Sequence, residues 1–138
     1  MLNHPQSTIL RQKWLPLGLL LLVGAALFPY GLVEEMLPWM NGLFARFNSV
    51  TAHVVGHMGL FALVGTAVLL AFPHLLKQPR LYLGGMLLLG ILQEVLQIVG
   101  FKHRLPVFDD FFDVGVDVFA ALLVWFMFKQ WRSIRDNN

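Results

Sequence analysis

The sequence lacks cysteine altogether and has little charge. Without cysteine, disulfides, thiolate metal sites and cysteine nucleophiles are excluded. Asp, Glu, Lys and Arg make up only 13% of the 138 residues, against about 25% in a typical soluble chain. The net charge is +2, but the basic residues are spread along the chain without a Lys/Arg block. We therefore expect no nucleic-acid partner.

Apolar residues are what the chain has in abundance. They make up 57% of the residues, and the mean hydropathy is +0.67. A helix of about 20 mostly apolar residues crosses the roughly 30 Å hydrocarbon core of a bilayer. Residues 14–32, 52–73, 81–100 and 111–128 meet this requirement. The sequence predicts an all-α fold, a bundle of four transmembrane helices that forms one integral membrane domain over residues 1–138.

The distribution of Lys and Arg predicts the orientation of this bundle. Short cytoplasmic loops carry more Lys and Arg than external ones. One side of the predicted bundle has Arg11, Lys13, Lys77, Arg80, Lys129, Arg132 and Arg135, and the other only Arg46, Lys102 and Arg104. We expect both termini in the cytoplasm and the loops 33–51 and 101–110 outside.

The first outer loop contains a short helical pattern. Met40, Phe44 and Phe47 recur at i, i+4 and i+7, as in an amphipathic helix. We expect a short helix in the outer interface of the membrane; a compact loop with scattered aromatic residues is the alternative.

Polar residues sit inside three of the predicted spans at a common depth. With a rise of about 1.5 Å per residue, His57, Glu94 and Asp117 lie about 8 to 9 Å below the outer ends of their spans. Ionisable residues within a span usually face the bundle interior and pair with one another. We therefore expect an outward-facing polar pocket among the last three spans.

Helical spacing selects the residues that would line this pocket. Gln97 lies one turn after Glu94, and Asp110, Asp113 and Asp117 form one acidic stripe. Arg104, in the loop above, is the expected partner for one or two carboxylates. The predicted ligand-binding residues are His57, Glu94, Gln97, Arg104, Asp110, Asp113 and Asp117. A purely structural charge network is the competing interpretation.

His53 and His57 are spaced as in a zinc-binding helix. The intervening glutamate of that motif is missing, however, and no span supplies a third imidazole. The only plausible ligands would be His53, His57 and an aspartate. We therefore expect neither a metal nor another cofactor, and we interpret His53 as an interfacial residue.

Several motifs, taken in order, resemble the VanZ-like family of small bacterial membrane proteins. They are HMGLF from His57, QEVLQ from Gln93, Arg104, and DFFDVGVD from Asp110. The similarity covers about residues 51–125, although Asp117 stands where the family usually has Asn and Ala120 where it has Gly. The resemblance implies a multi-pass protein of the bacterial inner membrane linked to the cell envelope. The family is associated with glycopeptide resistance, which is not a prediction for this chain.

Three functions are compatible with such a pocket. The first is binding of an outer-leaflet ligand, either a lipid headgroup or a cell-wall precursor, with Arg104 and Lys102 meeting phosphate at the rim. The second is an enzyme acting on a lipid-linked phosphate or acyl group, with His57, Glu94 and Asp113 as candidate catalytic residues. The third is a structural or assembly role. The implied partners are membrane lipids, a cell-wall precursor, an envelope protein or a second copy of the chain.

Overall fold

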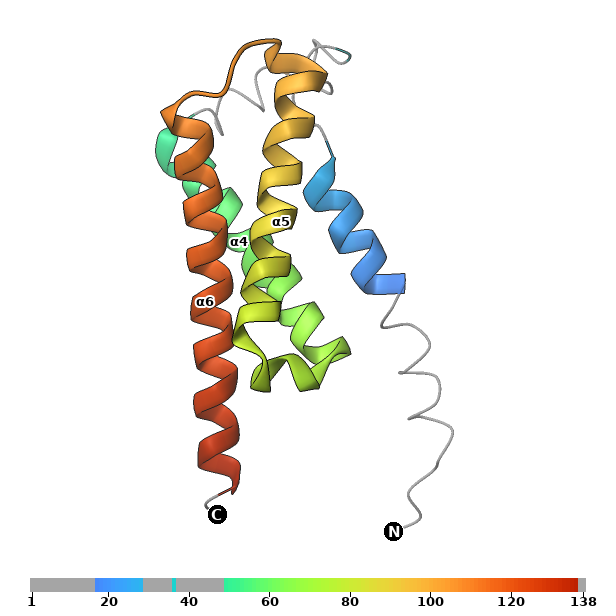
Figure 1. Cartoon of the computed structure of the whole chain (residues 1–138), viewed down its shortest axis with the longest axis vertical. Coiled ribbons are helices and arrows are strands. Elements are labelled where there is room, and N and C mark those ends of the chain that lie inside the picture. The colour runs from blue at the N-terminus through green and yellow to red at the C-terminus, as the bar shows by residue number, and fades with distance from the viewer. Residues whose placement is uncertain (1–16, 29–35, 37–48, 137–138) are drawn as a thin grey trace.

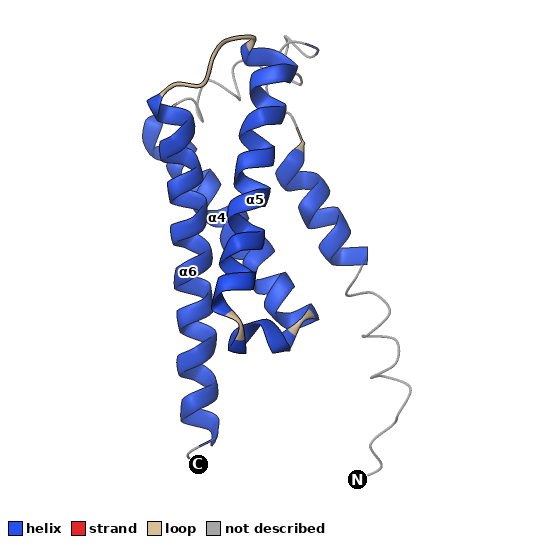
Figure 2. Ribbon diagram, in the orientation of Figure 1, coloured by secondary structure: helices blue, strands red, loops and turns tan. Residues whose placement is uncertain are grey.

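The computed structural model describes residues 17–28, 36 and 49–136, and the secondary structure in this part of the chain is entirely helical. A short helix, Leu17–Leu27, comes first. The elements after it are α4 (Val50–Ala71), the 3₁₀ turn η2 (Pro73–Lys77), α5 (Pro79–Gln97), the π-helical turn η3 (Ile98–Lys102) and α6 (Phe108–Asp136). Figure 1 shows their order, and Figure 2 shows the helices in blue and the described loops in tan.

Among the described residues, three helical segments are long and apolar enough to cross a membrane: Val50–Ala71, Pro79–Gly100 and Phe108–Arg135. They confirm the expected apolar helices over 52–73, 81–100 and 111–128. The last helix begins earlier and ends later than predicted, because Phe108 opens it and its final turns continue into the polar tail.

The fourth predicted span is only partly described. Leu17–Leu27 is helical and apolar, but this described segment is shorter than a membrane crossing requires. The remainder of 14–32 lies outside the described residues, as do Met40, Phe44 and Phe47 of the expected interfacial helix. A fourth span and the orientation of the bundle therefore stay predictions.

Local signals explain where the helices begin. The Ser49 hydroxyl accepts a hydrogen bond from the backbone N–H of Ala52, which caps α4. Pro79 occupies the first position of α5, where its missing N–H is not needed. At the start of α6, the Asp110 carboxylate accepts a bond from the N–H of Val107 at 2.8 Å. This is one of the two hydrogen bonds of a capping box, the one in which the side chain of the third helical residue accepts from the N–H of the residue before the helix.

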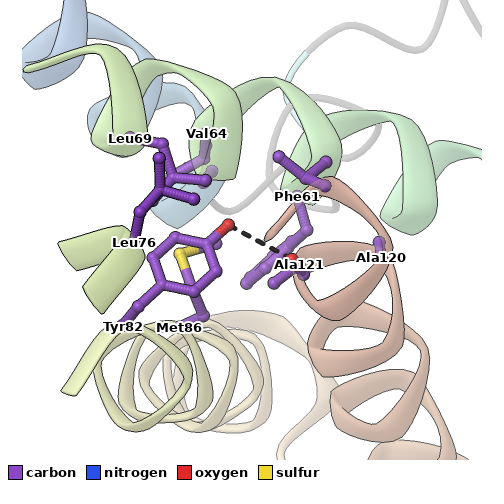
Figure 3. Packing of buried hydrophobic residues seen from close by; sticks show 10 residues of the cluster. Phe61, Val64, Leu69, Leu76, Tyr82, Met86, Ala120 and Ala121 are labelled. Atoms are coloured by element: carbon purple, nitrogen blue, oxygen red, sulfur yellow. Dashed lines mark hydrogen bonds between the residues drawn. The ribbon is translucent and has the colours of Figure 1, made fainter. Parts of the chain in front are cut away.

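Helix α6 packs along both α4 and α5 (Figure 1). Between them lies an apolar core in which Phe61, Tyr82, Met86 and Ala121 are buried (Figure 3). The Tyr82 hydroxyl crosses to α6 and donates to the carbonyl of Ala121 at 3.3 Å. Small residues allow this close approach of the helices, as in many membrane bundles.

Many large apolar side chains face outward, and a group of polar side chains is buried beside the apolar core. The outward-facing residues include Leu63, Leu81, Leu88, Phe111, Phe126 and Met127, and the buried polar residues are His57, Gln93, Glu94, Asp110, Asp113 and Asp117. This arrangement suits a lipid solvent, because only groups with internal partners tolerate hydrocarbon.

Candidate functional site

The polar residues gather at one end of the three-helix unit. The first turns of α4 and α6 lie there beside the last turns of α5 and the turn η3 (Figure 1). Because α5 runs opposite to its neighbours, its C-terminal residues meet their N-terminal ones. The structure thus brings together groups separated by up to 60 residues in the chain.

His57 and Asp117 form the deepest pair of this cluster. Nδ1 of His57 lies 2.9 Å from Oδ1 of Asp117, and both side chains are buried. When the Asp117 carboxylate is ionised it only accepts hydrogen bonds, and Nδ1 is then the nitrogen that carries the proton and donates it. The second ring nitrogen, Nε2, is then left with a free lone pair. Asp117 therefore orients the imidazole.

A second His–Asp pair lies one turn nearer the end of the bundle. Nε2 of His53 is 2.9 Å from Oδ2 of Asp113. The Asp113 side chain is buried, whereas 49% of the His53 side chain is exposed. The rings of His53 and His57 are tilted against each other with centroids 4.6 Å apart. The two pairs therefore form one continuous imidazole–carboxylate layer between α4 and α6.

Lys102 links α5 to α6 across the top of this layer. Its Nζ donates to Oε2 of Glu94 at 3.0 Å and to Oδ1 of Asp110 at 2.7 Å. The turn η3 makes this reach possible, because its wider π-helical winding changes the direction of the residues that follow Gln97. His103, in a left-handed conformation with φ of 44°, then ends the helix.

Asp110 is the most heavily bonded carboxylate of the cluster. Besides Lys102 and the Val107 N–H, it accepts two bonds from the Arg104 guanidinium, at 2.7 and 3.0 Å. This bidentate geometry is the strong form of the Arg–carboxylate pair. The expected pairing of Arg104 with a carboxylate is therefore observed, and Asp110 is its partner.

Both basic groups remain positively charged in this setting. Burial lowers the pKa of Lys102, but its hydrogen bonds to Asp110 and Glu94 outweigh burial and leave the pKa raised. The hydrogen bonds to Asp110 likewise raise the pKa of Arg104. Each cation is already paired with a carboxylate of the cluster.

Negative charge nevertheless exceeds positive charge in the cluster. Glu94, Asp110, Asp113 and Asp117 supply four carboxylates, and Lys102 and Arg104 are the two cations that face them. With neutral imidazoles, the cluster carries an excess of two negative charges if every carboxylate is ionised. Such an excess in a low-dielectric environment favours binding of a cation or of hydrogen-bond donors.

Three buried oxygen atoms in the described part of the chain have no hydrogen-bond partner. They are Oε1 of Gln93, Oε1 of Glu94 and Oδ2 of Asp117. Buried polar atoms are rarely left unpaired, because desolvation without a partner costs about 1–3 kcal/mol each. All three are acceptors, which again indicates a donor or a cation as the complementary ligand.

Of the predicted ligand-binding residues, Gln97 alone stays outside this network. Its side chain is half-buried and makes no hydrogen bond to another described residue. Gln93, one turn earlier, is the buried amide instead. The other six predicted residues all take part in the interactions described above or are directly bonded to them.

From the sequence we named His53 only as a plausible metal ligand and preferred to interpret it as an interfacial residue, and we placed Lys102 only at the rim of the pocket. For His53 a signal existed, because its i, i+4 spacing with His57 put both rings on one face. For Lys102 it did not, because residues eight apart on a regular helix lie about 12 Å apart along the axis. The π-helical turn between the two residues brings Lys102 back over Glu94.

His53, His57 and Asp113 each offer one metal-ligand atom, and these atoms lie within 4.8 Å of one another. This is the set named from sequence as the only plausible one, with the aspartate now identified as Asp113.

Comparison of the chain with protein-family models, with curated proteins and with solved structures finds no match in any of the three. The resemblance to the VanZ-like family therefore stays a prediction based on the motifs alone.

Proposed function

We propose that this protein is a VanZ-like, multi-pass protein of the bacterial inner membrane, with the polar cluster on the side away from the cytoplasm. Lys77, Lys129 and Arg132 support this orientation, because they line a common cavity at the opposite end of the bundle. Basic residues at one end mark the cytoplasmic side. At the polar end, Lys102 and Arg104 are both neutralised by carboxylates.

The function that the geometry supports best is binding of an outer-leaflet ligand, a lipid headgroup or a cell-wall precursor. The observation that carries this proposal is the set of unpaired, buried acceptor oxygens on Gln93, Glu94 and Asp117. They lie in a cluster with excess carboxylates, and a ligand with ammonium, hydroxyl or amide groups would donate hydrogen bonds to them. The half-exposed His53 and Arg104, with 49% and 37% of their side chains exposed, mark the accessible side of the cluster.

The test is ligand retention by the purified protein. We expect native mass spectrometry from nanodiscs containing phosphatidylethanolamine, or a lipid-linked cell-wall precursor, to show a bound molecule on the wild type. Glu94→Gln and Asp113→Asn should lower its occupancy at least about tenfold, since each changes a buried charged partner. Retention of the ligand by both variants would refute the proposal.

Asp109→Asn is the matched control. Asp109 is an exposed acid in the same first turn of α6, so its replacement removes one negative charge outside the buried cluster. Ligand occupancy should then stay at the wild-type level. If Glu94→Gln and Asp113→Asn instead unfold the protein in step with the loss of ligand, the structural or assembly function is the better interpretation.

An enzymatic function is the second candidate, and the His57–Asp117 pair favours it. A buried carboxylate that fixes an imidazole leaves Nε2 able to accept a proton, as a general base requires. In such an enzyme, a lipid-linked phosphate or acyl group would be the substrate. Turnover of these lipids by the wild type and its loss in His57→Gln would establish this function over simple binding.

A further inference from the structure

We propose that His53, His57 and Asp113 together bind a divalent metal ion, and that Zn²⁺ is the ion their chemistry fits best. The inference deepens the proposed function, on whose site it rests. Two imidazoles and one carboxylate are typical ligands of zinc sites that keep an open position. It replaces our expectation from spacing alone, because α6 supplies the third ligand that α4 lacks.

The distances are compatible with such a centre. The three ligand atoms lie within 4.8 Å of one another. Bonds of about 2.0–2.2 Å to Zn²⁺ in tetrahedral geometry place ligand atoms about 3.4 Å apart. Shortening of the longest separation by at most about 1.4 Å therefore completes the site. His53 is the ligand free to move, since half of its side chain is exposed.

Asp117 supplies the interaction that usually accompanies a metal-binding histidine. Such a histidine donates its other ring N–H to a carboxylate, which fixes the tautomer and the orientation of the ring. Nδ1 of His57 makes this bond to Asp117, so Nε2 is the ligand atom. Asp117 is completely buried and therefore holds the ring in place.

The charge of the cluster also matches a dication. The two excess carboxylate charges are balanced by one M²⁺ ion. The neutral His53 ring then carries its proton on Nδ1, which leaves Nε2, now 2.9 Å from Oδ2 of Asp113, free to bind the ion. The open fourth position then accepts an oxygen atom, and a phosphate oxygen of the outer-leaflet ligand becomes a suitable partner.

This assignment excludes a proton-accepting role for His57. Nε2 cannot both bind the metal and act as a general base. Metal binding therefore favours a function in which the ion, rather than the imidazole, contacts the ligand.

The experiment is Zn²⁺ titration of the full-length protein in detergent after treatment with a chelator. Isothermal titration calorimetry measures the affinity, and elemental analysis measures the bound metal. We expect one Zn²⁺ per chain with micromolar or tighter affinity. Co²⁺ in place of Zn²⁺ should give the visible absorption of a four-coordinate site. Absence of saturable binding, or binding unaffected by the variants below, would overturn the proposal.

The variants separate ligands from neighbours. His53→Ala and Asp113→Asn should each weaken Zn²⁺ binding more than about 100-fold, and Asp117→Asn about 10- to 100-fold. His53→Ala is the decisive variant, because an exposed position tolerates replacement without loss of the fold. His74→Ala is the control; His74 is exposed in η2, at the other end of the bundle, and should leave the affinity unchanged.

The same preparations distinguish failure of this inference from failure of the proposed function. If the wild type binds no Zn²⁺ but still retains an outer-leaflet ligand through Glu94, the metal site is refuted and the function stands. If Zn²⁺ binds through His53 and Asp113 while no lipid or precursor is retained, the metal site stands and the proposed function fails.

Discussion

At the scale of single residues, charge pairing decides which polar groups the bundle tolerates. Glu94 and Asp110 are buried, and each is bonded to Lys102. Loss of one partner of a buried ion pair leaves an uncompensated charge, which is more damaging than removal of both partners. The contribution of Lys102 to the free energy of unfolding therefore depends on whether Glu94 is charged.

We predict that Lys102→Met lowers the free energy of unfolding by about 2 kcal/mol, because hydrogen bonds to charged groups contribute about 1.5–3 kcal/mol. In the Glu94→Gln background the same change should cost less than half as much. The measurement is a double-mutant cycle, with unfolding followed in mixed detergent and SDS. Additive effects of the two changes would contradict it, and Lys77→Met, at an exposed position in η2, is the control.

The pH dependence of this effect follows from the raised pKa of Lys102. A cation whose pKa is raised on folding contributes its full stability below its unfolded pKa, near the ordinary value of 10.5, and loses it only above the folded pKa. The difference between wild type and Lys102→Met should therefore be constant from neutral pH to about pH 10 and decrease only above it.

At the scale of elements, contacts between helices depend on small residues at defined positions. Gly65 of α4 faces Tyr82 of α5 and the backbone of Ala121 in α6. Gly90 of α5 lies against Asp117, where an added Cβ would be 3.2 Å from Oδ2. These glycines let polar and aromatic groups fit between the helices.

We predict that Gly65→Ala destabilises the bundle by about 1–2 kcal/mol, despite the better helix propensity of alanine. The new Cβ would overlap the Tyr82 hydroxyl and disturb its hydrogen bond to Ala121. Thermal unfolding of the purified protein is the measurement. Tyr82→Phe should restore part of the loss, because it removes the overlapping oxygen.

Gly59→Ala is the matched control on the same helix. A Cβ at Gly59 meets nothing within 4 Å, so the change should be neutral or slightly stabilising. Equal destabilisation by the two substitutions would show that helix packing at Gly65 is not the cause.

At the scale of the whole molecule, the lack of cysteine provides a direct test of the proposed orientation. We predict that an impermeant maleimide labels Leu105→Cys in intact bacterial spheroplasts, and that it labels Ser133→Cys only after permeabilisation. Leu105 lies in the loop above the polar cluster with 84% of its surface exposed, and Ser133 lies near the opposite end of α6. The reverse labelling pattern would place the cluster on the cytoplasmic side.

The sequence by itself determined the class of the protein and the depth of its polar residues. Hydrophobic runs reflect local composition, and the helical rise converts residue numbers into depth. The level shared by His57, Glu94 and Asp117 therefore follows from their positions in the chain. The sequence predicted no metal, but it named two histidines and an aspartate as the only plausible ligands for one.

Only the tertiary structure decided which groups meet. The rotation of each helix about its axis depends on packing against its neighbours, and periodicity within one helix does not contain that information. The packing of α4 against α6 therefore decides that His53 pairs with Asp113 and His57 with Asp117. The reach of Lys102 to Glu94 depends in addition on a π-helical turn, which no local composition signals.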